Sequence, residues 1–117
     1  MLIKDFYAAV EGNYEEILCA LGKEERVVKF LLKFPQSNID KELTAAMESK
    51  DFEAAFRAAH TLKGMSINIG LKSLHLISSQ LTESLRYGPT GDVEGLTAKT
   101  LEEYNRICTL ISELEQV

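Results

Sequence analysis

One histidine of this chain has neighbours that could assist chemistry on its ring. His60 is followed at three, four and seven residues by Lys63, Gly64 and Ile67, the spacing of side chains that share one surface of an α-helix. A neutral imidazole keeps a free lone pair on one ring nitrogen at pH 7 and can act as a nucleophile. The positive charge of Lys63 could meet an anionic group on that nitrogen. The pair therefore suits a phosphoryl group.

Gly64 and Ile67 indicate that another molecule approaches this strip. A glycine inside a helix costs about 1 kcal/mol relative to alanine, and the apolar stripe of this helix does not need a missing side chain there. An apolar Ile67 beside bare backbone favours a docking surface, with Lys63 and Arg57 at its edge. Two alternatives stay open, namely that Ile67 packs against a neighbouring helix and that Lys63 is an ordinary solvated charge.

Several other chemistries lack the residues they need. No Ser, Cys or carboxylate set for hydrolysis surrounds His60, and no glycine-rich phosphate-binding loop occurs in the sequence. The second histidine, His75, is not four residues from His60, so the two rings do not have the spacing that shares a metal ion on one helix. We expect no ATP binding, no metal site and no cofactor on this chain, and we interpret His75 as an ordinary surface or half-buried ring.

The elements that must position His60 are all predicted to be helical. Gly and Pro residues separate segments whose apolar residues recur at three- and four-residue spacing, and no segment alternates with period two. Short helices are predicted over 3–10, 14–21 and 24–34. Longer ones follow from a capping box at Ser37 and Asp40 to about residue 49, from Asp51 to a left-handed cap at Gly70, over 71–85, and from Asp92 to the C-terminus.

Short connections force sequential helices to be neighbours, which predicts an antiparallel up-and-down four-helix bundle. We expect one domain over 1–117, with additional short N-terminal helices in 1–36 covering one end and the bundle in 37–117. In the helix of His60, the apolar stripe leaves the histidine facing solvent. That stripe consists of Phe52, Ala55, Phe56, Ala59, Leu62 and Ile69.

Composition excludes several classes of function. The 117 residues have a net charge of −5 and are 45% hydrophobic, which suits a soluble domain with its own core. No basic stripe could neutralise nucleic-acid phosphates, and no apolar run is long enough for a membrane span. The start lacks a signal peptide, so we expect a cytoplasmic protein, and Met1 favours a free-standing one. Cys19 and Cys108 each lie among apolar residues and are predicted to be buried.

The segment from Ala59 to Gly70 resembles the H-x-[LI]-K-G-x5-G signature of histidine-containing phosphotransfer (HPt) domains of two-component phosphorelays. Four bundled helices and a chain near this length are also typical of that family. The resemblance implies that His60 accepts a phosphoryl group from a receiver aspartate or a kinase and passes it to another receiver. It also implies that Lys63 helps to hold the phosphoryl oxygens, that Gly64 lets the receiver approach, and that Gly70 ends the helix.

Further expectations follow from the same resemblance. The chain would be a phosphoryl carrier rather than an enzyme, and a monomer whose partners are a response-regulator receiver domain, a sensor histidine kinase, or both. Mg²⁺ would belong to the receiver. Thr82 departs from the Gln or Glu that many members carry at that position near the histidine, so its shorter hydroxyl would need a water to reach the imidazole.

Two other interpretations remain open at this stage. The chain could be an HPt-like adaptor that binds a receiver or kinase without phosphotransfer, for which Thr82 is the only hint in the sequence. It could also be an unrelated helical bundle with a hydrolytic or metal-dependent function, although no carboxylate set for such a site is visible.

Overall fold

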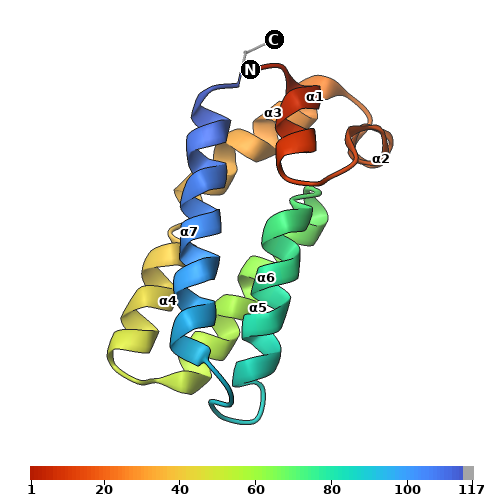
Figure 1. The fold of residues 1–117 in the computed structure, drawn as a ribbon. Helices are drawn as coiled ribbons and strands as arrows, with labels where there is room; N and C mark the ends of the chain where they lie inside the picture. The colour runs from red at the N-terminus through yellow and green to blue at the C-terminus, as the bar shows by residue number, and fades with distance from the viewer. Residues whose placement is uncertain (115–117) are drawn as a thin grey trace.

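A computed structural model describes residues 1–114, and all regular structure in them is helical (Figure 1). In chain order the elements are α1 (Ile3–Ala9), α2 (Tyr14–Leu21), α3 (Glu24–Lys33), the 3₁₀ helix η1 (Phe34–Ser37), α4 (Ile39–Glu48), α5 (Phe52–Asn68), α6 (Lys72–Leu85) and α7 (Val93–Ser112). The predicted helices all occur, with ends shifted by a few residues. One end was wrong: α7 stops at Ser112, whereas we expected it to reach the C-terminus, and residues 115–117 lie outside the described part.

Helices α4 to α7 form an antiparallel bundle (Figure 1). Helix α5 packs chiefly against α4 and α6, and α6 packs against α7, because short turns keep sequential helices adjacent. The predicted all-α class and four-helix bundle with additional N-terminal helices are therefore confirmed.

Helices α1, α2 and α3 cover the end of the bundle where α5 turns into α6 (Figure 1). Hydrogen bonds from α1 and the residue that follows it fix α1 there. The Tyr7 hydroxyl donates to the Ile69 carbonyl at 2.8 Å, and the Ser73 N–H donates to the Val10 carbonyl at 2.9 Å. Burial raises the pKa of Tyr7 well above its usual range, so the hydroxyl stays a donor. The N-terminal helices thus hold the α5–α6 turn in place.

Aspartates begin two bundle helices as the sequence predicts. The Asp51 carboxylate accepts from the Ala54 N–H at 3.1 Å at the start of α5. At the start of α7, the Asp92 carboxylate accepts from the Gly95 N–H at 2.9 Å. The capping box predicted for α4 is wrong. Its N-cap is Asn38, which has a left-handed backbone with φ 59° and no side-chain cap, a conformation that asparagine tolerates better than most residues.

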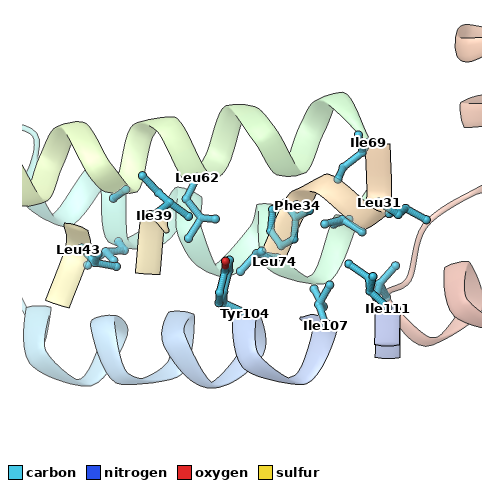
Figure 2. Packing of buried hydrophobic residues seen from close by; sticks show 14 of the residues in the cluster. Leu31, Phe34, Ile39, Leu43, Leu62, Ile69, Leu74, Tyr104, Ile107 and Ile111 are labelled. Atoms are coloured by element: carbon cyan, nitrogen blue, oxygen red, sulfur yellow. The ribbon is translucent and has the colours of Figure 1, made fainter. Parts of the chain in front are cut away.

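The core of the bundle lies between α5 and α7 and continues under the N-terminal helices (Figure 2). Leu62 and Leu74 meet Tyr104 and Ile107 there, and all four are buried. Two predicted core residues, Phe52 and Phe56, are only partly buried against this cluster. The prediction that both cysteines are buried was wrong for Cys19, which is exposed, whereas Cys108 is half-buried.

Gly70 ends the helix of His60, as predicted. Its φ is +73°, and the N–H groups of Gly70 and Leu71 donate to the carbonyls of Ile67 and Ser66, the pattern of a Schellman motif. A Cβ atom at this position would lie 2.5 Å from Ile17 of α2. The turn therefore depends on glycine both for its backbone conformation and for space.

Gly70→Ala is expected to lower the free energy of unfolding by about 1–3 kcal/mol, because alanine disfavours positive φ and its Cβ would displace Ile17. Urea unfolding followed by circular dichroism measures the change. An unchanged free energy of unfolding would contradict this account of the turn.

Candidate functional site

Helix α5 presents one face to the core and the opposite face to solvent. Ala55, Ala59 and Leu62 have no exposed surface, so α5 is held tightly against its neighbours. His60 is exposed on the other face, as the helical periodicity predicts, and Ile67 is 47% exposed. The structure therefore favours Ile67 as an exposed apolar residue over the alternative that it packs against a neighbouring helix.

One side of α5 carries residues that recur at three- and four-residue spacing. We call this set the outer strip of α5, and it consists of Arg57, His60, Lys63, Gly64 and Ile67. Arg57 is exposed and paired with Glu53 at 3.1 Å. A Cβ atom at Gly64 would meet no heavy atom within 4 Å. Packing within the described residues thus gives no reason for glycine at that position.

The His60 ring lies beside Phe56, one turn earlier in α5, with ring centroids 5.9 Å apart. No hydrogen bond to the His60 ring occurs within residues 1–114, so neither ring nitrogen is engaged by the described part of the chain. The guanidinium carbon of Arg86, the C-cap residue of α6, lies 5.3 Å from the centroid of the Phe56 ring on α5. This distance is in the range of a cation–π contact. The end of α6 therefore places a cation over the Phe56 ring, which in turn neighbours the His60 ring.

Arg86 also forms an ion pair with Glu83, three residues earlier in α6. Its Nη2 donates to a carboxylate oxygen of Glu83 at 2.7 Å, and its Nε donates to both oxygens at 3.1 Å. These hydrogen bonds are the main reason that the pKa of Glu83 is lowered, and the charge of Lys63 on α5 lowers it further. One carboxylate thus interacts with cations from both helices.

Sequence reasoning missed the contact of Phe56 with His60, the contact of Arg86 with Phe56, and the ion pair of Arg86 with Glu83. Phe56 had been counted as core, and Arg86 lies just past the end of α6, outside any periodic stripe. The antiparallel order of α5 and α6 was the available signal, because it brings the end of α6 alongside the start of α5. Leu76, seven residues before Glu83 on α6, is a further exposed apolar residue at 47%.

Thr82 does not have the environment that the sequence suggested. Its side chain has no exposed surface, and its hydroxyl donates to the Ser78 carbonyl within α6 at 2.7 Å. The expectation that a water would link this hydroxyl to the imidazole is therefore wrong, because the hydroxyl is buried and bonded within α6. Thr82 belongs to the core of the bundle, because its hydrogen bond within the helix allows a hydroxyl to be buried.

His75 lies on α6, at the Ile67 end of the outer strip. It is half-buried near the start of α6, where it lines a groove with Ile67, Glu16 and Lys72. Within residues 1–114, no three His, Cys, Asp or Glu side chains gather in a group that could hold a metal ion. In the same part of the chain, no helix has the length and apolar character that crossing a membrane requires.

Comparison with known proteins identifies one family. The family model described as Hpt domain matches residues 37–117, which is more than half of the chain and includes α4 to α7. No curated protein and no solved structure matches the sequence significantly. The matched residues contain the whole outer strip of α5 and the Arg86–Glu83 ion pair.

Gly64→Ala is expected to raise the free energy of unfolding by up to about 1 kcal/mol, because alanine favours the helix and its Cβ would meet nothing within 4 Å. Thermal unfolding followed by circular dichroism measures the effect. A destabilisation similar to that of Gly70→Ala would mean that Gly64 has a packing role after all.

Proposed function

The chain belongs to the Hpt domain family, and from that membership we propose that it relays a phosphoryl group through a phosphohistidine at His60. The family places the chain in phosphotransfer-related two-component signalling, where its members are phosphoryl carriers and not catalytic enzymes. The observation that supports His60 best is its exposure on the outer face of α5, beside Lys63 and a glycine with open space around it.

The proposed chemistry is a transfer between two nucleophiles. The lone pair of a His60 ring nitrogen attacks the phosphorus of a phosphoaspartate on a receiver domain. The N–P bond forms as the P–O bond breaks, and the electron pair of that bond returns to the aspartate carboxylate. Transfer to the next receiver reverses these steps. Because the phosphoaspartate is already activated, this chain supplies position, a nucleophile and charge.

Lys63 and the apolar part of the outer strip would have different roles in the transfer. The Lys63 ammonium would neutralise phosphoryl oxygens on the ring nitrogen one turn away. Gly64 and Ile67 would form the contact with the receiver, with Arg57 at the edge, since a bare backbone position permits close approach. These features would place the receiver's aspartate against the imidazole.

The proposed partners are a response-regulator receiver domain and a sensor histidine kinase. Mg²⁺ would be bound by the receiver, and we assign no cofactor to this chain. As for other small relay domains, we propose a monomer acting in the cytoplasm. Without phosphotransfer, the same surface would serve an adaptor that binds a receiver, and the following experiment distinguishes the two functions.

His60→Gln is expected to abolish phosphoryl acceptance and to leave the helical content unchanged, because the side chain is exposed and outside the core. The measurement is incubation with a phosphorylated receiver, followed by intact-mass analysis at neutral pH and after brief acid treatment. His75→Gln is the matched control and should retain the acid-labile adduct. Acceptance by His60→Gln would overturn the assignment, and receiver binding without any adduct on the wild type would favour the adaptor.

Lys63→Ala is expected to slow phosphoryl transfer by about tenfold without preventing it, since a charge-assisted contact to the phosphoryl group is lost. Rapid-quench kinetics with a phosphorylated receiver give the rate. Lys99→Ala, which removes an exposed charge from α7, is the control. Equal rates for the wild type and both variants would remove Lys63 from the site.

A further inference from the structure

The carboxylate of Glu83 is paired with Arg86, and its pKa is also lowered by the charge of Lys63, which belongs to the outer strip of α5. Glu83 is paired with Arg86 by three hydrogen bonds of 2.7 to 3.1 Å, and its side chain is 61% exposed. A site built only to hold an anion would have no use for this negative charge.

Arg86 is fixed in place before any phosphoryl group arrives. Its guanidinium is held by Glu83 on one side and lies over the Phe56 ring on another, and that ring neighbours the imidazole of His60. Only 33% of the Arg86 side chain is exposed. Because a planar guanidinium in two such contacts loses little further freedom, it provides a preorganised charge beside the site.

The balance of these charges bears on how tightly the phosphoryl group is held. A phosphoryl group carries about two negative charges at neutral pH. Lys63 and Arg86 would stabilise it on His60, and Glu83 would destabilise it. A carrier must both accept and release its phosphoryl group. Excess positive charge would make phosphohistidine too stable to pass the group on.

We propose that Glu83 sets the phosphoryl-transfer equilibrium of His60, by offsetting the charges of Lys63 and Arg86 so that the group can leave. The inference rests on the proposed function. Glu83 forms no bond to phosphorus and takes up no proton. In the release step the N–P bond breaks, its electron pair returns to the imidazole, and a P–O bond forms to the receiver's aspartate. Glu83 acts only through its charge and through the position it gives to Arg86.

The two partners of this ion pair should have opposite effects when changed. In Glu83→Gln an amide oxygen can still accept from Arg86 while the negative charge is lost, so the equilibrium should move about three- to tenfold toward phosphohistidine. Arg86→Gln removes a cation and should move it in the reverse direction. If the pair were merely structural, Glu83→Gln would leave the equilibrium close to that of the wild type, because its amide keeps a hydrogen bond from Arg86, and the two variants would not shift it in opposite directions.

The experiment measures the ratio of phosphorylated chain to phosphorylated receiver at equilibrium, by intact mass, for the wild type, Glu83→Gln and Arg86→Gln. Glu102→Gln on α7 is the matched control, because it changes the net charge equally at an exposed position. The shift for Glu83→Gln should shrink between 0.05 and 0.5 M salt, since salt screens exposed charges.

Each outcome decides a separate claim. Opposite shifts that shrink with salt support the proposal. Shifts in one direction, or a Glu83→Gln ratio equal to that of Glu102→Gln, overturn it and leave the phosphorelay function intact. A wild type that never becomes phosphorylated contradicts the proposed function itself. Thermal unfolding of each variant by circular dichroism identifies any change that comes from loss of structure.

Discussion

The packing of one face of α5 against α4 and α6 is the constraint on which the rest of the structure depends. Ala55, Ala59 and Leu62 are fully buried there, so the helix has one rotational setting. That setting leaves His60 exposed and directs Gly64 and Ile67 outward with it. A small rotation of α5 would bury the imidazole or withdraw the glycine. The same burial that stabilises the bundle therefore positions the proposed site.

The N-terminal helices reinforce this setting from outside the family match. They contact the turn after α5 through Tyr7 and the backbone around Ser73, and Gly70 permits the close packing of Ile17 against that turn. These contacts restrain the end of α5 nearest Ile67. The outer strip is consequently held by packing along its length and by hydrogen bonds at its end, which favours a rigid surface for a partner to meet.

Much of the fold could be predicted from the sequence, because amphipathic periodicity and residues such as Asp51 and Gly70 act locally. The exposure of His60 followed from the same periodicity. The parts that failed depend on tertiary contacts. The contact between Arg86 and Phe56 needs the relative position of two helices, and the burial of Thr82 becomes evident only when its hydroxyl is seen bonded to Ser78. A local pattern also could not show that Asn38 caps α4 with its backbone alone.

The most direct test of the central claim is nuclear magnetic resonance of the imidazole nitrogens, recorded while a phosphorylated receiver is added. The chain contains only two histidines, so the signals of His60 and His75 can be separated by a single substitution. We predict phosphorus–nitrogen coupling and a shifted resonance at one nitrogen of His60, with the His75 ring free of phosphorus coupling. Coupling at His75, or phosphate bound to the chain through oxygen, would contradict the account.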